Sequence, residues 1–208
     1  MKNIKDEAVI WGQFIAFIVI WSVILFATNT PLKINFEAIK KLPEVVTVYT
    51  VLFFVFTKWV WRIPQLQGWL VPFPDLEGTW EGTLKTTWID PKTKKTPVPI
   101  PLILVIRQSF NSINCVMYTK ESNSYSTTAN FMNDDESGIK RLSYVYTNRP
   151  DASIRDRSAV HDGAAILTIV SKPKRELEGE YWTSRKTTGS INLMFKTKEL
   201  LEGFSDEN

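Results

Sequence analysis

The hydrophobic pattern changes once along the chain, from long apolar runs to alternation of apolar and polar residues. The first run, AVIWGQFIAFIVIWSVILFA, covers residues 8–27 without a charge. At about 1.5 Å per residue, a helix of that length crosses a hydrocarbon layer about 30 Å thick. A second run covers residues 45–61, where Lys58 can extend toward the headgroups beside Trp59 and Trp61. We therefore predict a two-helix transmembrane anchor within residues 1–62.

The rest of the chain has the pattern of a small β domain. Residues 63–75 hold three prolines and predict a semi-rigid linker. From there a period of two begins, and turn residues separate eight predicted strands: 79–88, 100–108, 113–120, 125–132, 139–147, 164–170, 176–183 and 190–196. Eight antiparallel strands can close into a compact barrel. We predict an all-β C-terminal domain over residues 76–208, an eight-stranded antiparallel barrel, with a β-sandwich as the alternative.

Polar and small residues inside the apolar runs predict contact faces between helices. Thr47, Thr50 and Thr57 lie on one side of a helix, and Gly12 and Ala16 form a small-xxx-small pair beside Gln13. Such faces join helices in membranes, here between subunits. The alternative is that they pack the two helices of one monomer, or that the threonines bond their own backbone carbonyls.

Charge and cysteine content bear on topology and partners. The loop between the runs carries three lysines (Lys33, Lys40 and Lys41), and the other side carries four basic residues (Lys2, Lys5, Lys58 and Arg62). This near balance, with the single cysteine Cys115, slightly favours a cytoplasmic barrel. The net charge is +3, yet from Asp75 onward 18 Lys and Arg balance 18 Asp and Glu. A neutral domain argues against binding a polynucleotide, which needs many phosphate contacts.

The sequence lacks the motifs of common enzyme classes. His161 is the only histidine, which excludes a histidine metal cluster. No G-x-S-x-G, P-loop or G-x-G-x-x-G sequence occurs. We expect a protein without catalytic residues, metal or cofactor.

The remaining candidate residues suit an anionic ligand that carries rings. They are Arg107, Tyr144, Tyr146, Asn148, Tyr181, Trp182, Arg185 and Lys186. Aromatic faces stack on bases, and arginine binds phosphate oxygens through two parallel hydrogen bonds. The alternatives are that the aromatic residues fill the barrel core and that Arg107 lies at the exposed end of its strand.

Two segments carry a resemblance to a known family. They are DLEGTWEG at residues 75–82 and LEGEYWTSRKTTG at residues 177–189, after two apolar runs. The chain resembles the two-transmembrane β-strand-rich effectors associated with CD-NTases in bacterial CBASS anti-phage defence.

The resemblance implies a function and a location. A CD-NTase makes a cyclic dinucleotide, the barrel binds it, and the proteins then self-associate through their membrane segments. Disruption of the lipid bilayer of the inner membrane kills the infected cell. The implied location is the bacterial inner membrane, with a multi-pass anchor and a cytoplasmic barrel. The alternative is a constitutive tethered barrel that carries an apolar ligand or serves as a protein-interaction module.

Overall fold

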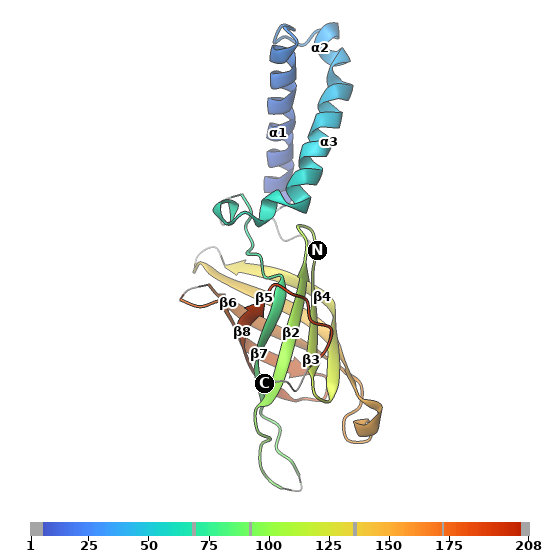
Figure 1. The fold of residues 1–208 in the computed structure, drawn as a ribbon, viewed down its shortest axis with the longest axis vertical. Helices are drawn as coiled ribbons and strands as arrows, with labels where there is room; N and C mark the ends of the chain where they lie inside the picture. The colour runs from blue at the N-terminus through green and yellow to red at the C-terminus, as the bar shows by residue number, and fades with distance from the viewer. Residues whose placement is uncertain (1–5, 68–69, 92, 135–136, 172, 205–208) are drawn as a thin grey trace. The chain divides into compact units, whose positions relative to one another are not determined.

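The computed structural model describes residues 6–67, 70–91, 93–134, 137–171 and 173–204. Lys2 and Lys5, used in the topology prediction, lie outside these ranges, as do two linker residues (68–69). The chain divides into two compact units, Met1–Pro74 and Asp75–Asn208 (Figure 1). The boundary falls at the end of the predicted linker.

The first unit is helical. Its elements are α1 (Asp6–Ala27), α2 (Phe36–Lys40), α3 (Leu42–Lys58) and the short 3₁₀ segments η1 (Val60–Arg62) and η2 (Pro64–Leu66). Within the described residues, α1 is the one helix long and apolar enough to cross a membrane, over Ile10–Ala27. α3 has 17 residues, so its role as a second span remains a prediction. α2, inside the predicted loop, is capped by the Asn35 side chain, which accepts a hydrogen bond from the Ala38 amide at 2.8 Å.

The polar residues of α1 and α3 are accessible in the isolated chain. Gly12, Gln13 and Ala16 are exposed on α1, as are Thr47 and Thr50 on α3. The threonine hydroxyls donate to carbonyls of their own helix: Thr47 to Pro43 at 2.9 Å, Thr50 to Val46 at 2.8 Å and Thr57 to Phe54 at 3.2 Å. The hydroxyls are therefore satisfied without a partner helix, as one of the alternatives supposed.

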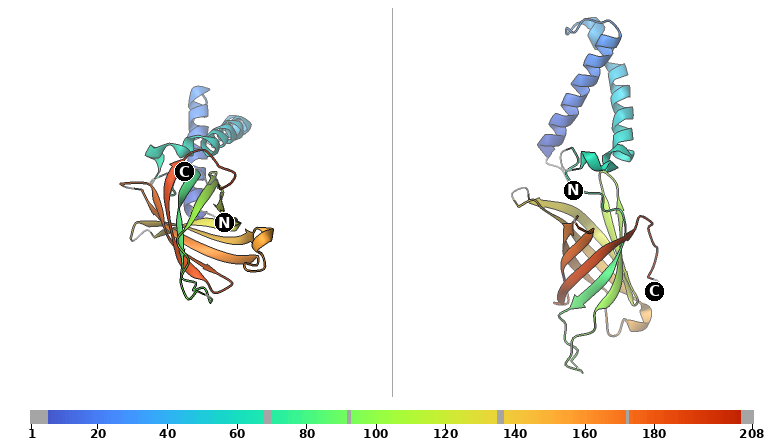
Figure 2. Two further views of the ribbon diagram at one scale, coloured as in Figure 1. Left: turned by 60° about the horizontal axis from the view of Figure 1, so that its bottom comes forward. Right: turned by 60° about the vertical axis from the view of Figure 1, so that its left-hand side comes forward.

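The second unit is a closed antiparallel barrel whose eight strands follow one another in chain order. The strands are β1 (Gly78–Thr86), β2 (Ile100–Gln108), β3 (Ile113–Thr119), β4 (Ser122–Asp134), β5 (Ile139–Pro150), β6 (His161–Val170), β7 (Glu176–Thr183) and β8 (Thr188–Thr197). β1 pairs with both β2 and β8, which closes the ring (Figure 2). This confirms the predicted barrel and excludes the sandwich.

Alternation along each strand separates an inner from an outer face. The barrel end where β1 begins is filled with large apolar side chains, and we call it the apolar end. Trp80, Leu104, Leu142 and Leu177 have no exposed surface there. The Trp80 indole donates to the Leu76 carbonyl at 3.0 Å and packs against the Phe195 ring, 5.3 Å away between centroids. The apolar end is therefore a packed core.

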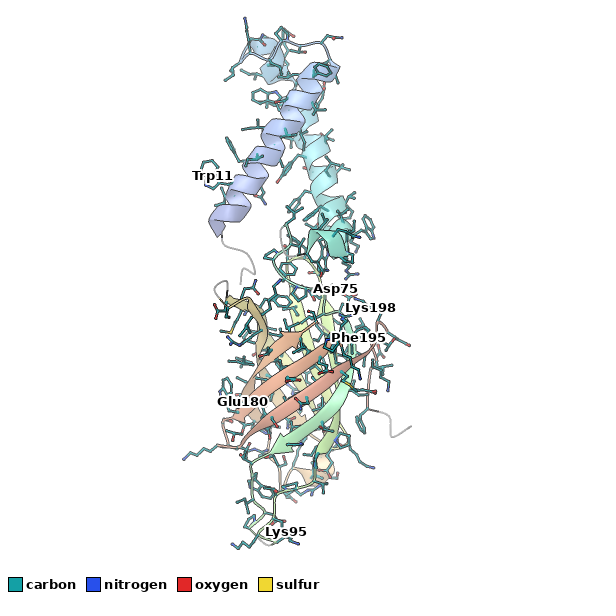
Figure 3. All side chains as sticks on the ribbon, turned by 90° about the vertical axis from the view of Figure 1, so that its left-hand side faces the viewer. Trp11, Asp75, Lys95, Glu180, Phe195 and Lys198 are labelled. Carbon is teal, nitrogen blue, oxygen red and sulfur yellow. The ribbon has the colours of Figure 1, made fainter. Side chains whose placement is uncertain are left out.

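Asp75, the first residue of the second unit, is fixed by two basic side chains. Lys198 forms an ion pair with its carboxylate at 2.7 Å, and Arg175 donates to its backbone carbonyl at 2.8 Å (Figure 3). The Arg175 guanidinium also lies over the Phe195 ring, 4.0 Å from its centroid. These contacts from β6–β7 and the segment after β8 fix the point where the chain enters the barrel.

We predict that Trp80→Ala lowers the free energy of unfolding by about 3–5 kcal/mol, because it empties the apolar end. Urea unfolding of the detergent-solubilised full chain, followed by circular dichroism, measures this. Trp182→Ala is the matched control, since Trp182 is 45% exposed on β7, and it should change stability by less than about 1 kcal/mol. Equal losses in the two variants would contradict the packing described here.

Candidate functional site

The opposite end of the barrel interior, where β1 ends, is lined by tyrosines and small polar residues. We call it the tyrosine end. Its inward residues on β5 are Tyr144, Tyr146 and Asn148, which alternate as predicted and pair with Ala165, Gly163 and His161 of β6. Tyr181 follows on β7, opposite Ala165. Three of the predicted residues on β5 and one on β7 thus share one interior surface.

The inner polar side chains of the tyrosine end are buried, but not completely. Its inner side chains retain small exposed fractions: Tyr181 6%, Ser124 7%, Tyr146 8%, Asn148 8% and Thr183 9%. Ser124 donates to the Asn148 amide oxygen at 2.8 Å, which orients that side chain. This end therefore presents ordered polar groups that are nearly but not completely buried.

Two glycines leave room for the tyrosine rings. A Cβ atom on Gly163 would lie 2.5 Å from the Tyr146 ring and its hydroxyl, and one on Gly189 would lie 2.5 Å from the Tyr181 ring. Any larger residue at either position would displace the ring. The Tyr144 and Tyr146 rings lie 5.8 Å apart between centroids, tilted by 45°.

Arg185 brings positive charge to this end. It lies exposed in the β7–β8 turn, where its guanidinium donates to the Ser158 hydroxyl at 3.1 Å. The turn is tied down by the Thr183 and Thr187 hydroxyls, 2.6 Å apart, and by the Ser184 amide, which donates to the Asp162 carbonyl at 2.8 Å. The arginine is therefore held by an ordered turn.

Burial and the charge of Arg185 both affect the pKa of three inner side chains. Burial raises the pKa of Tyr146 to about 12, and the Arg185 charge partly opposes that rise. Burial also raises the pKa of Tyr181, against the hydrogen bond from Thr86 and the charge of Arg185. Burial lowers the pKa of His161, the hydrogen bond with the Ala159 carbonyl raises it, the charge of Arg185 lowers it, and the charge of Asp162 raises it. At neutral pH the tyrosines are therefore protonated donors.

The Tyr144 hydroxyl is an unsatisfied polar group. It is buried and has no hydrogen-bond partner within the described part of the chain. Burial raises its pKa well above the usual value, with a smaller contribution from the neighbouring Cys115. A buried donor without a partner is rare in folded proteins and points to an absent water or ligand atom.

The described strands point no carboxylate into the interior. On the described strands, every Asp and Glu falls on the outward set: Glu81, Asp134, Asp162, Glu176, Glu178 and Glu180. Neutral donors, aromatic rings and one arginine without an opposing carboxylate suit a ring-bearing anion. This composition distinguishes the tyrosine end from the rest of the barrel.

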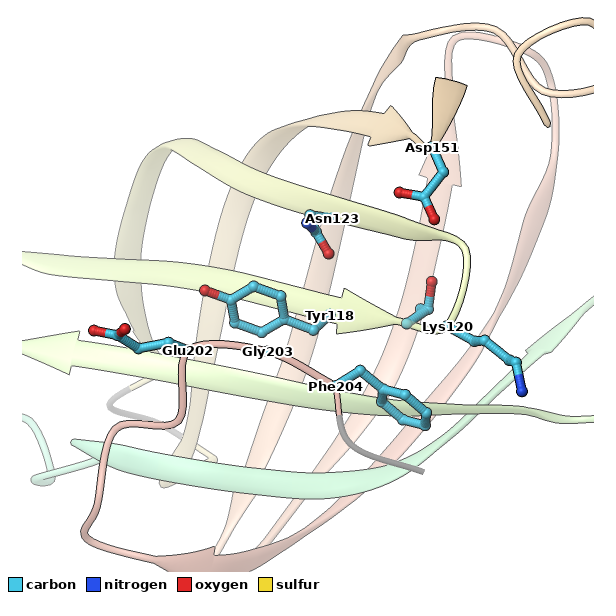
Figure 4. A pocket seen from close by; sticks show the side chains of 8 residues that line it. Tyr118, Lys120, Asn123, Asp151, Glu202, Gly203 and Phe204 are labelled. Carbon is cyan, nitrogen blue, oxygen red and sulfur yellow. The ribbon is translucent and has the colours of Figure 1, made fainter. Parts of the chain in front are cut away.

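A separate groove lies on the outer wall. Its volume is about 410 Å³, and it is lined by Tyr118, Thr119, Lys120, Asn123, Asp151, Glu202, Gly203 and Phe204 (Figure 4). The C-terminal segment forms one side of it, anchored where the Thr79 hydroxyl donates to the Glu199 carbonyl at 2.6 Å. Two carboxylates against one lysine make the groove a poorer site for an anion than the tyrosine end.

Three predicted residues lie apart from the tyrosine end. Arg107 is exposed on the outer face, on the same side of β2 as Ile103 and Val105. Trp182 points outward from β7, and Lys186 is exposed in the β7–β8 turn with a φ of 61°. We therefore leave Arg107 and Trp182 out of the candidate site and place Lys186 at its rim.

Sequence reasoning missed several polar residues of the interior: Thr86, Ser124, His161 and Thr183. Serine and threonine in a β strand do not by themselves indicate a site. The inward-facing alternation of Ser122, Ser124 and Ser126 opposite Asn148 and Tyr146 was the available signal.

The fold and the interior define a closed β-barrel with a polar, positively capped end, the class of a small-ligand receptor. The family model for "Cap15, cyclic dinucleotide receptor domain" matches residues 71–194. The chain belongs to this family, as the resemblance in its sequence indicated.

Two relatives carry the name CD-NTase-associated protein 15. The protein from Staphylococcus schleiferi is 28% identical over 135 residues, which cover 65% of this chain and 66% of the relative. The protein from Escherichia albertii is 27% identical over 164 residues, which cover 74% of this chain and 80% of the relative. The match thus spans about two thirds of the length of the staphylococcal relative.

We predict that Tyr144→Phe leaves the ligand-free protein equally stable or stabilises it by about 1 kcal/mol, because it removes a buried donor without a partner. Ser124→Ala is the matched comparison, since it breaks the hydrogen bond with Asn148 and should cost about 1 kcal/mol. Urea unfolding of the full chain checks both. Equal losses would show that the Tyr144 hydroxyl is already satisfied.

Proposed function

We propose that this chain is a membrane-tethered receptor of CBASS anti-phage signalling that binds a cyclic dinucleotide at the tyrosine end and then disrupts the inner membrane. The observation that carries the proposal is that the described strands point no carboxylate into the interior, and that tyrosines line its end nearest Arg185. That interior lies within the region matched by the cyclic dinucleotide receptor model. A CD-NTase would supply the ligand, as the names of the relatives imply.

The tyrosine end offers each group that such a ligand needs. Arg185 carries the charge and two-pronged donors for a phosphate, with Lys186 beside it at the rim. Tyr146 and Tyr181 offer ring faces for bases and protonated hydroxyls for polar edges. The unsatisfied Tyr144 hydroxyl marks a deeper position where a ligand atom would complete a hydrogen bond.

Membrane disruption requires more than one copy of the chain. Two helices enclose no pore, so disruption requires several copies, and α1 and α3 expose candidate contact faces on Gly12, Gln13, Ala16, Thr47 and Thr50. A shift from 1:99 to 99:1 between silent and clustered states takes about 5.5 kcal/mol of differential binding. Two stacked bases at about 1–3 kcal/mol each, with phosphate contacts, can supply most of it.

The constitutive carrier is the weaker alternative. A carrier of apolar ligands needs an apolar cavity. Here the apolar end is packed by side chains with no exposed surface, such as Leu104 and Leu142, and the accessible end is polar. The proposed receptor performs no chemistry on its ligand, since its residues supply binding and orientation.

We predict that Arg185→Ala weakens cyclic dinucleotide binding by the full chain about ten-fold to a hundred-fold, because one charged hydrogen-bond donor is lost. Calorimetric titration with a panel of cyclic dinucleotides measures the dissociation constant. Arg185→Lys should recover part of the affinity by restoring charge without the planar fork.

Arg107→Ala is the control for this titration, because Arg107 is an exposed arginine on the outer face. Its affinity should stay within about two-fold of the natural chain, a small change on the free-energy scale of binding. If the natural chain binds no member of the panel, or if the Arg107 variant loses as much as the Arg185 variant, the proposed site is wrong.

We predict that the triple variant Thr47→Leu, Thr50→Leu, Thr57→Leu still inserts into the membrane but no longer kills the cell on signalling. Leucine keeps the segment apolar and fills the face proposed to join copies. Membrane fractionation and cell viability after induction of a cognate CD-NTase measure the two properties. Killing at the natural level would discard this face.

A further inference from the structure

The outer face of β5, β6 and β7 holds an exposed apolar strip that the ligand site does not use. One row across the three strands is Val145, Ala164 and Trp182, which are directly paired. Val145 is 41% exposed and Trp182 is 45% exposed. The large indole of Trp182 thus lies next to the smaller apolar side chains of Ala164 and Val145 on the outer sheet face.

A second row on the same face carries opposite charges. Arg141 pairs with Thr168, and Thr168 pairs with Glu178, so the acid lies on β7 and the base on β5. Within the described part of the chain, neither Arg141 nor Glu178 forms an ion pair. Glu180, also on this outer face, adds to the acidic side (Figure 3). The face is therefore basic along β5 and acidic along β7.

We propose that this face binds the same face of a second copy of the chain. A twofold axis along β6 places β7 of one copy over β5 of the other and keeps each row opposite itself. Trp182 then lies over Val145 and Ala164 of the second copy, and Glu178 lies opposite the second copy's Arg141. Both matches occur twice by symmetry.

The contact is small, because two convex barrels touch only along their central strands. Interfaces of that size are weak in free solution. Tethering to a membrane raises the effective concentration of the barrels, so a weak contact becomes populated. The pairing does not depend on the identity of the ligand and adds a barrel contact to the helix contacts of the proposed function.

Crosslinking of the full chain in bacterial membranes tests the proposal. Thr168→Cys lies on the proposed axis, and Thr83→Cys is the matched control, a half-buried threonine on the outer face of β1. The natural Cys115 is buried, so it contributes little background. A short bismaleimide reagent should join Thr168→Cys chains into dimers and leave Thr83→Cys chains monomeric. Equal crosslinking of the two, none at Thr168→Cys, or a product of another mass would overturn the proposal.

Charge reversal provides the second readout in the Thr168→Cys background. Arg141→Glu and Glu178→Arg should each reduce the dimer about ten-fold, because each turns two attractive pairs into repulsive ones. The combined variant restores opposite charges and should recover the dimer. Circular dichroism and calorimetry of each variant verify that the barrel is folded and its ligand affinity unchanged, which separates this proposal from the ligand site. Loss in the combined variant, or no loss in the single ones, would refute the pairing.

Discussion

The closure of the strand ring is the constraint on which the rest of the structure depends. Because β1 pairs with β2 on one side and β8 on the other, the eight described strands form a closed ring. Closure also forces one set of alternating residues into a narrow interior. The two ends of that interior are lined by different residues. Trp80, Leu104 and Leu142 fill one end, and Tyr146, Asn148 and Tyr181 line the other. Apolar packing and the polar inner side chains therefore lie at opposite ends of the barrel.

This division explains how a small barrel can hold buried polar groups. The packed apolar end supplies most of the hydrophobic stabilisation, while Ser124, Asn148 and Thr183 are held by hydrogen bonds among themselves and with the tied β7–β8 turn. Arg185 is positioned by that turn rather than by burial, so its charge stays hydrated. The Tyr144 hydroxyl, which has no partner within the described part of the chain, would gain one from a ligand bound at the proposed site.

The sequence predicted the barrel well because strand periodicity and turn residues are local signals. All eight strands were found, and β2 and β7 had the observed bounds. The alternation of Tyr144, Tyr146 and Asn148 was readable for the same reason. It was harder to predict which side chains lie on the inner face of the barrel. Arg107 and Trp182 have suitable chemistry but point outward. Gly163 and Gly189 make room for tyrosine rings only once the register places them beside those rings.

The proposed function requires that the ligand bind inside the barrel at the tyrosine end. Hydrogen exchange of the full chain, with and without a bound cyclic dinucleotide, measures where the ligand protects the backbone. We expect added protection along Tyr144–Asn148 of β5 and in the β7–β8 turn around Arg185. Protection confined to the outer groove at Tyr118 and Phe204, or no change at the tyrosine end under saturating ligand, would contradict it.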